Sequence, residues 1–289
     1  MRAGRERSKT LPGLRQVVWL TPRMVAVDVI SWNVRGLATR GRARKAAELA
    51  GRSWQLCLIQ EATPDGFEEF AAAAGADDAV AVSQHLPEDV LAAEGLTYFC
   101  AALVREPARL VAARALDVPS PERTLAATVD VGGSRFTAAS LALPPGVNWG
   151  PAKPRQALLL ARWLAERAGP VIFGIDANTP KTERADLAEN TWWHADEARL
   201  LGVERSHDAR DVYRDYLQAT GALSPAGADG PLAVSFERHG GQGRRVGCRY
   251  DAIYATPEWH VDDAAYHYNA GRTAGSDHGY VTATLRLAR

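Results

Sequence analysis

GPVIFGIDANTPK, residues 169–181, is the stretch that decides the fold. Residues 171–175 form a short apolar run between Gly-Pro and a polar turn, which predicts a buried strand that ends at Asp176 and Asn178. Ligands bind at the carboxyl ends of strands in α/β sheets, so these two side chains are candidates for chemistry. The same Asp-x-Asn pattern before Thr-Pro is also typical of an ordinary Asx turn, and the segment alone leaves both interpretations open.

Composition limits the classes of function. The chain has 289 residues, 46% hydrophobic and 24% charged, which is ordinary for a globular protein with a sizeable core. The formal net charge is zero, but residues 1–24 hold six basic residues against Glu6, so this segment carries +5 and the remainder −5. The body is therefore no polycation, which argues against tight non-specific binding to duplex nucleic acid.

The ends and the cysteines give the expected organisation and compartment. We expect residues 1–24 to form a flexible basic N-terminal extension, with Met24 as a candidate start, and residues 25–289 to form a single domain. No apolar run approaches the roughly 20 residues that span a membrane, and the N-terminus lacks the apolar region of a secretory signal. Cys57, Cys100 and Cys248 are widely separated, which suits neither a disulfide framework nor a zinc site. We expect a cytoplasmic protein.

Polar residues follow several other predicted strands. Residues 25–32 (VAVDVISW) alternate and are rich in β-branched side chains, and Asn33 follows them. Residues 56–59 form a second apolar run, which is followed by Gln60 and Glu61. A strand at 249–255 carries Asp251, and Asp277-His278 directly precede a final strand at 280–285.

The intervening segments predict further strands and helices. Short strands are expected at 97–104, 109–116, 124–131 and 134–143, with Gly132-Gly133 joining the last two as a hairpin. Helices are expected at 39–52, 67–74, 155–168 and 209–219. We interpret 182–204 as an insertion or lid, 225–245 as a Gly-rich mobile loop and 273–277 as a turn.

The residues at the strand ends are mostly oxygen donors with one imidazole, which suits Mg²⁺ or Mn²⁺ better than zinc. Five segments carry a resemblance: ISWNVRGL at 30–37, LIQEATP at 58–64, GIDANTP at 174–180, RYDAIYA at 249–255 and SDHGYVTATL at 276–285. In this order and spacing the chain resembles the endonuclease/exonuclease/phosphatase superfamily of metal-dependent phosphodiesterases, over about residues 25–286. Pancreatic-type deoxyribonucleases, apurinic-site endonucleases and neutral sphingomyelinases belong to this superfamily. The resemblance implies a four-layer α/β sandwich, in which two mixed, mostly antiparallel sheets pack face to face with helices outside.

The resemblance also implies the metal ligands. Glu61 matches the principal ligand of Mg²⁺ (or Mn²⁺), and Asn33 and Asp277 match residues that help to hold the ion or its waters. Two residues after Asn33, where some relatives have an acidic ligand, this chain has Arg35. The substitution points to a single-metal arrangement, and we expect Arg35 to bind substrate instead.

Catalytic roles carry over in the same way. Asp176 matches the residue that orients or deprotonates the attacking water, and Asn178 the residue that positions it. His278 matches the imidazole that contacts the scissile phosphate, with Asp251 as its partner. Arg155, expected at a helix N-terminus beside the site, is a further candidate for binding substrate.

One position departs from the family pattern. In the strand that leads into LALPPG, many relatives have a His, or a Tyr in apurinic-site enzymes, where this chain has Ala142. Turnover is then expected to be slower, unless Asn148 or Tyr213 supplies the missing donor. Other residues have a stronger structural interpretation: His194 in a solvated lid, Trp192-Trp193 in packing, and Arg40, Arg42, Arg44 and Lys45 on an exposed helix face.

We therefore expect a Mg²⁺-dependent hydrolase that cleaves phosphodiester bonds, with nucleic acid as substrate, as an endonuclease or an exonuclease. The first alternative is a phosphodiesterase or phosphatase that acts on small molecules or lipids, which the balanced charge would suit. The second is a catalytically impaired binding protein on the same fold. No obligate protein partner is inferred.

Overall fold

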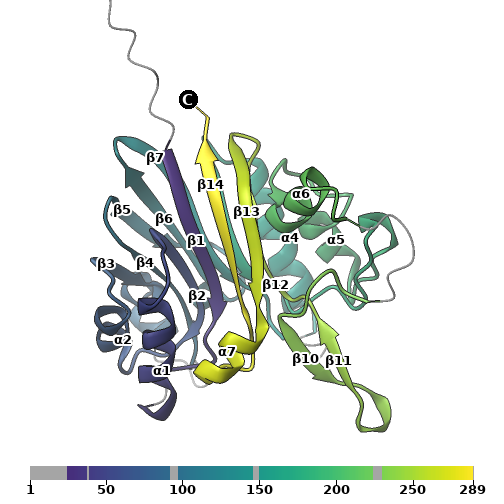
Figure 1. Ribbon diagram of the computed structural model, residues 1–289, viewed down its shortest axis with the longest axis horizontal. Coiled ribbons are helices and arrows are strands. Elements are labelled where there is room, and N and C mark those ends of the chain that lie inside the picture. The colour runs from purple at the N-terminus through teal and green to yellow at the C-terminus, as the bar shows by residue number, and fades with distance from the viewer. Residues whose placement is uncertain (1–24, 38, 92–96, 146–149, 224–229, 289) are drawn as a thin grey trace, which may run out of the picture.

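The computed structural model describes residues 25–37, 39–91, 97–145, 150–223 and 230–288. The predicted extension at 1–24 lies outside these residues. Two six-stranded sheets face each other, and helices cover their outer surfaces (Figure 1). The four-layer α/β sandwich expected from the sequence is therefore confirmed.

The first sheet has the strand order β13-β14-β1-β2-β4-β3. Strands β1 and β2 are parallel, and the other neighbours are antiparallel. The first and last strands pair along their lengths, with Val25 opposite Leu287, so the two ends of the described chain lie side by side. The bounds are β1 Val25–Asn33, β2 Leu56–Ala62, β3 Asp78–Ala81, β4 Phe99–Val104, β13 Trp259–His267 and β14 Tyr280–Leu287.

The second sheet has the order β5-β6-β7-β8-β12-β9. Strands β7 and β8 are parallel, which the crossover through α4 (Ala152–Ala165) makes possible. In this sheet β8 is the predicted central strand and ends at Asp176. The bounds are β5 Ala108–Ala115, β6 Thr124–Val131, β7 Ser134–Ala142, β8 Val171–Asp176, β9 Arg210–Asp211 and β12 Asp251–Ala255.

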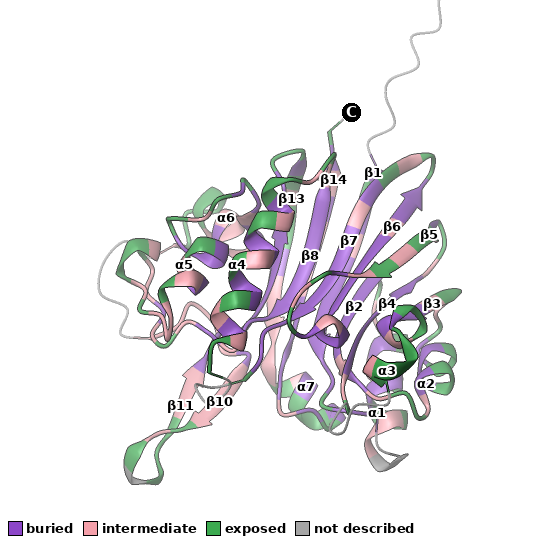
Figure 2. Ribbon diagram, turned by 180° about the vertical axis from the view of Figure 1, so that it is seen from behind, coloured by how far each residue is buried: buried purple, intermediate pink, exposed green. Residues whose placement is uncertain are grey.

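Three apolar clusters hold the layers together. One fills the space between the two sheets, where Val29 and Leu58 of the first sheet meet Val129 and Ile172 of the second. A second packs α1 (Thr39–Ala50), α2 (Phe67–Ala73) and α7 (Tyr268–Ala274) on the outer face of the first sheet. The third packs α4 and α5 (Ala195–Leu201) on the outer face of the second, and Figure 2 shows the buried strands between these helical layers.

The two sheets approach each other closely at Gly174 in β8. A Cβ atom at this position would lie 2.7 Å from Ser31 Cβ and 3.2 Å from Leu58 Cβ, so only glycine fits without movement. Beside it, buried Gln60 donates from Nε2 to Ser31 Oγ and Ser140 Oγ and so bridges the sheets. This polar bridge lies close to the end of β8, because Gln60 Nε2 also donates to the Gly174 carbonyl.

The structure corrects several sequence predictions. The segment predicted as a Gly-rich mobile loop contains the hairpin of β10 (Phe236–His239) and β11 (Arg245–Cys248), which projects from the body (Figures 1 and 2). Strand β13 and helix α7 were not predicted. The segment expected as an insertion contains α5, and α6 (Val212–Ala219) lies within the predicted helix at 209–219. Among the described residues, no helix is long and apolar enough to cross a membrane.

Candidate active site

Several strand ends meet at one edge of the sandwich. Asp176 at the end of β8 lies opposite Asp251 at the start of β12 in the antiparallel register. Asn33 ends β1 in the other sheet, and its Nδ2 donates to Asp176 Oδ2 at 2.8 Å. The site therefore bridges both sheets, and all three of these side chains are buried.

Asp176 is held by amide donors. Asn178 Nδ2 donates to its Oδ2 at 3.2 Å, and the Asn178 backbone N–H donates to Oδ1 at 3.2 Å. Burial raises the pKa of Asp176, and the Asp251 carboxylate adds to this, while His278 and the amide hydrogen bonds lower it; the net pKa is about 6. The carboxylate is thus ionised at neutral pH with a basicity suited to accepting a proton.

His278 is paired with Asp251. Its Nδ1 lies 2.8 Å from Asp251 Oδ2, and its ring stacks on Phe236 with centroids 4.6 Å apart. Burial lowers the pKa of His278, but the Asp251 and Asp176 carboxylates outweigh burial and raise it to about 10. The ring is therefore an imidazolium at neutral pH, with Nε2–H as a second donor.

These three residues form a compact group. One ligand atom from each of Asp176, Asp251 and His278 lies within 4.8 Å of the others. Because Nδ1 of His278 already faces Asp251, we interpret the group as a charge network that positions an acid and a base. The sequence predicted all four catalytic candidates at one site, and the structure brings Asp176, Asn178, Asp251 and His278 together.

The predicted metal ligands interact with the charges of this group. Burial raises the pKa of Glu61, and Asp176 and Asp277 raise it further against the opposing effect of Arg123 and His278. Asp277 forms an ion pair with the exposed Arg35, Nη1 to Oδ2, at 3.0 Å. Asn33 Oδ1 accepts from the Arg35 backbone N–H at 2.9 Å, so this oxygen supports the turn after β1.

Backbone strain is concentrated at this site. Among the described residues, Arg35, Glu61 and Asn178 are the non-glycine residues with positive φ, at 49°, 55° and 50°. Each such conformation costs on the order of 1–3 kcal/mol and persists only where the surroundings impose it. All three were predicted site residues, so the strained positions coincide with those expected to bind metal or substrate or to position the water.

The side chains present fit a divalent cation. Asp277 Oδ1 and Asp251 Oδ1 are buried and have no hydrogen-bond partner within the described part of the chain. Burial contributes most to the raised pKa of Glu61, and repulsion by the Asp176 and Asp277 carboxylates adds to it. A hard cation held by Glu61 and Asp277 would relieve this repulsion and would satisfy the free oxygen of Asp277.

Comparison with protein families agrees with this geometry. The model of the Endonuclease/Exonuclease/phosphatase family matches residues 30–278, which include every site residue above. The chain belongs to the endonuclease/exonuclease/phosphatase family. A search of curated proteins found no match.

Solved structures show the same family fold. TDP2 from D. rerio complexed with a single-strand DNA product has a TM-score of 0.64 at 18% identity, covering 90% of this chain and 98% of that one. The human Nocturnin catalytic domain with a bound sulfate anion has a TM-score of 0.62 at 17% identity, covering 91% and 95%. An endonuclease/exonuclease/phosphatase protein from Bacteroides vulgatus has a TM-score of 0.62 at 15% identity, covering 91% and 100%. At these identities the likeness shows the fold alone.

Two basic side chains near the site, those of Lys153 and Arg123, were not predicted from the sequence. Buried Lys153 in α4 donates from Nζ to the Asn178 carbonyl at 2.8 Å and lies 3.5 Å from Glu197 Oε1. The burial of Lys153 could have been predicted from the sequence, because Lys153 lies on the same apolar face of its helix as Ala157, Leu160 and Leu164. Arg123, also buried, lies 3.9 Å from Glu61 Oε1, and no local pattern separates it from other arginines.

Other predicted residues have different outcomes. Arg155 lies in the first turn of α4 with an exposed side chain, so its contact with substrate stays a prediction. Ala142 ends β7 opposite Asp176 and is buried, which places the departure from the family pattern beside the catalytic carboxylate. Of the two suggested replacement donors, Tyr213 packs edge-on against Tyr266, and Asn148 lies outside the described residues.

Some residues were expected to have a structural position and not a role in the site, and most of them do. Trp192 packs against the core of the second sheet, whereas His194, which precedes α5, has a buried Nε2 atom and so is not fully solvated. Arg42 pairs with Glu69, and Arg44 is exposed, whereas the side chain of Arg40 is not described. The expectation of an exposed Lys45 is wrong, because it is buried and donates to the Gly36 carbonyl at 2.7 Å.

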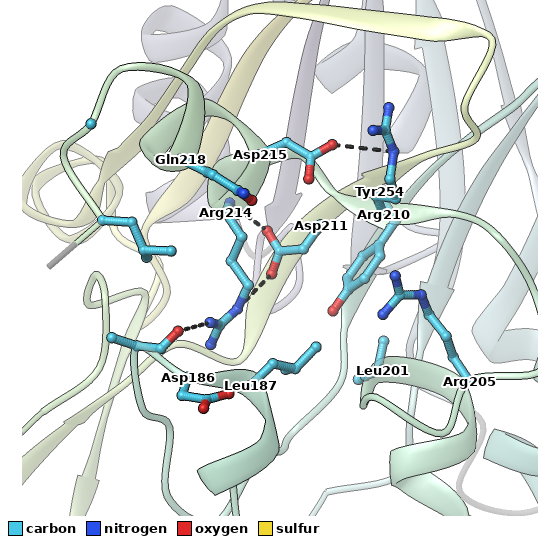
Figure 3. A pocket seen from close by; sticks show the side chains of 13 residues that line it. Asp186, Leu187, Leu201, Arg205, Arg210, Asp211, Arg214, Asp215, Gln218 and Tyr254 are labelled. Carbon is cyan, nitrogen blue, oxygen red and sulfur yellow. Dashed lines mark hydrogen bonds and ion pairs between the residues drawn. The ribbon is translucent and has the colours of Figure 1, made fainter. Parts of the chain in front are cut away.

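A hollow of about 670 Å³ lies apart from this site, beside β9 and α6 (Figure 3). Its charged side chains pair with one another, Arg210 with Asp215 and Arg214 with Asp211. This internal pairing leaves little net charge to attract a charged ligand, and we assign the hollow no role.

Proposed function

We propose that the protein hydrolyses phosphodiester bonds in nucleic acid with the help of Mg²⁺ or Mn²⁺. The observation that carries the proposal is the buried group of Asp176, Asp251 and His278, in which two carboxylates and an imidazole each have an atom within 4.8 Å of the others. Water attack on a phosphodiester needs both a group that accepts the water proton and a cation that faces the phosphoryl oxygens.

Asp176 is the proposed base. Its Oδ2 is fixed by Asn33 and Asn178, and Oδ1 accepts from the Asn178 backbone, so the carboxylate cannot rotate freely. Asn178 is held in turn by Lys153, through its carbonyl, and by its own Nδ2 bond to the Leu143 carbonyl. The carboxylate orients a water molecule for in-line attack and takes its proton.

His278 is the proposed electrostatic partner. With Nδ1–H committed to Asp251, Nε2–H is the donor left for a non-bridging phosphate oxygen. The positive charge offsets the negative charge that develops on the phosphoryl oxygens in the transition state. Stacking on Phe236 and burial keep the ring in one orientation.

Glu61, Asp277 and Asn33 are the residues that would hold the metal ion. When bound, Mg²⁺ or Mn²⁺ supplies Lewis-acid stabilisation of the phosphate and lowers the pKa of nearby water. Arg35 pairs with Asp277 and has a side chain that is 60% exposed, which supports the proposal that it contacts a substrate phosphate. Arg155 is proposed as a second, weaker contact.

The choice of nucleic acid is supported by the family and by one structural neighbour, the D. rerio TDP2 complex with a single-strand DNA product. Zero net charge favours the second candidate, a phosphodiesterase or phosphatase for small molecules or lipids. Ala142 beside Asp176 would favour a third, a binding protein without turnover. The three buried cysteines would suit a reducing, cytoplasmic location.

One set of assays separates these functions. Plasmid, abasic duplex, single-stranded DNA and RNA would be tested beside bis(p-nitrophenyl) phosphate, with Mg²⁺, with Mn²⁺ and with EDTA. We expect metal-dependent cleavage of a nucleic acid and its loss in Asp176→Asn, with Asp130→Asn at the far end of the sheet as a matched control. Hydrolysis of the small diester alone would favour the second candidate. Binding of nucleic acid without any hydrolysis would favour the third.

A further inference from the structure

A second pocket is lined by chain segments that continue from the catalytic residues. It has a volume of about 210 Å³ and lies between the segment 180–184 after β8, the hairpin of β10 and β11, and residues 230–231. It was not predicted, because the hairpin that forms one wall was expected to be a mobile loop.

Three chain segments lead from catalytic residues directly into this pocket. Pro180 lies two residues after Asn178, and Arg249 lies two residues before Asp251. The third segment is β10, where Phe236 stacks on His278 and Arg238 lines the pocket. Phe236 and Arg238 share one face of the strand and are separated by about 7 Å along it, so β10 connects the imidazole of His278 with a basic residue of the pocket.

The pocket has an excess of positive charge. Its lining contains four basic residues, Lys181, Arg184, Arg238 and Arg249, and one acidic residue, Glu183. Glu183 is buried and already accepts hydrogen bonds from Arg249 and Arg214 and from the Leu232 backbone. It therefore neutralises none of the other three cations.

The remaining cations have no acidic partner nearby. Within the part of the chain that the structure describes, no carboxylate lies at ion-pair distance from Lys181, Arg184 or Arg238. Arg238 Nε is buried and has no hydrogen-bond partner among the described residues, and the Lys181 ammonium lies 5.3 Å from the Trp193 ring centroid. Three cations without a carboxylate partner around one small pocket create a positive potential that attracts an anion.

We propose that Lys181, Arg184 and Arg238 form an anion-binding subsite that holds the phosphate next to the scissile one on a nucleic-acid strand. This inference rests on the proposed function and extends it, because it makes the enzyme selective for polymers with consecutive phosphates. A substrate with a single phosphodiester gains nothing from the subsite. The same chemistry serves DNA and RNA, which share the phosphodiester backbone.

The test compares two substrates in one triple variant, Lys181→Ala/Arg184→Ala/Arg238→Ala. Single-stranded 12-residue DNA and RNA oligonucleotides supply consecutive phosphates, and bis(p-nitrophenyl) phosphate supplies one. The matched control removes the same charge at the opposite end of the sheets, with Arg109→Ala/Arg135→Ala/Arg286→Ala. Thermal melting confirms that both variants are folded.

We expect the subsite variant to raise KM for the cleaved oligonucleotide about tenfold, with a smaller change in kcat. The slope of log(kcat/KM) against log salt should weaken by about 0.7 for each phosphate that the variant no longer neutralises. Values for bis(p-nitrophenyl) phosphate should not change, nor should the control triple variant behave differently from the wild type. Comparison of the DNA and RNA arms shows which polymer the subsite serves.

Two results overturn the inference while leaving the proposed function intact. The first is an unchanged KM and salt slope for the oligonucleotide, with hydrolysis preserved. The second is an equal loss on both substrates, or an equal loss in the control variant, which would make the effect general and not local. If the wild type hydrolyses neither substrate with Mg²⁺ or Mn²⁺, the proposed function is wrong. The proposed subsite, which rests on that function, is then wrong as well.

Discussion

His278 Nδ1 and Asp251 Oδ2 lie 2.8 Å apart, with both side chains buried and Phe236 stacked on the imidazole. Burial alone would strip the imidazole of its proton, and the carboxylate reverses that preference. The pair therefore fixes a positive charge beside Asp176 at neutral pH.

Asp251→Asn should shift the alkaline limit of activity to lower pH. With Asp251 ionised, the pKa of His278 is about 10, so the imidazolium persists across the neutral range. Without that carboxylate, burial dominates and the pKa falls, so the charge is lost at lower pH. The profile of kcat/KM between pH 6 and 10 on bis(p-nitrophenyl) phosphate would show this, and an unmoved alkaline limb would argue that Asp251 does not set the charge.

Mg²⁺ should stabilise the protein through Glu61. The half-buried Glu61 carboxylate is repelled by Asp176 and Asp277, and a cation bound there would relieve this repulsion and would bind only the folded state. Melting temperature should rise with millimolar Mg²⁺ or Mn²⁺ in the wild type and rise less in Glu61→Gln. Glu69→Gln, on exposed α2 surface, is the control. If isothermal titration calorimetry showed no binding of Mg²⁺ or Mn²⁺ to the wild type, the proposed metal site would be contradicted.

Gly174→Ala should destabilise the fold at the point where the sheets touch. The added Cβ would lie 2.7 Å from Ser31 Cβ, so one sheet must shift, at a cost of about 1–3 kcal/mol. Because Asn33 and Asp176 lie two residues beyond Ser31 and Gly174, activity should fall as well. Gly241→Ala, where a Cβ meets nothing within 4 Å, should be neutral in urea unfolding. Equal stability of the two variants would contradict the close approach.

His207 should make stability depend on pH. Burial lowers the pKa of His207 to about 4. The Leu200 carbonyl, which lies 2.8 Å from Nε2, has the smaller, opposite effect and raises the pKa. In the unfolded chain the pKa of His207 is near 6.5, so His207 binds a proton there at a pH at which it is still neutral in the folded protein. The contribution of His207 to the free energy of unfolding is therefore fully present above about pH 6.5 and is lost as the pH falls towards 4. The loss approaches about 3 kcal/mol.

The matched variant is His207→Gln, which keeps a donor for the Leu200 carbonyl and removes the titration. Urea unfolding at pH 7.5 and pH 5 should show a smaller drop in the variant than in the wild type. An equal drop in both proteins would assign the acid sensitivity to other groups.

Local sequence predicted much of the site because its residues follow short apolar strands. The run at 171–175 is too short for a helix, and its length predicted a strand whose polar end lies at the edge of a sheet. The same reasoning predicted that Asn33, Glu61 and Asp251 lie at strand ends. The pairing of His278 with Asp251 was predicted from the family resemblance. The two-sheet sandwich itself also came from that resemblance.

Contacts between distant segments could not be predicted in this way. The hairpin at 236–248 is rich in glycine and arginine, and Phe236 packs on a histidine that lies 42 residues further along the chain. Lys153 is buried because it reaches both Glu197 and the Asn178 carbonyl, which only the folded structure brings near. The pairing of Arg35 with Asp277 depends in the same way on the meeting of two strand ends.

The most direct measurement is the initial rate of cleavage of a labelled single-stranded DNA oligonucleotide with Mg²⁺, for the wild type, Asp176→Asn and His278→Ala, after circular dichroism confirms folding. We predict cleavage by the wild type, its loss in EDTA, and a fall of about 100-fold or more in each variant, the scale typical of removing a general base or an oxyanion-stabilising charge. Cleavage at equal rates by all three proteins, or none by the wild type with any phosphodiester, would contradict the account.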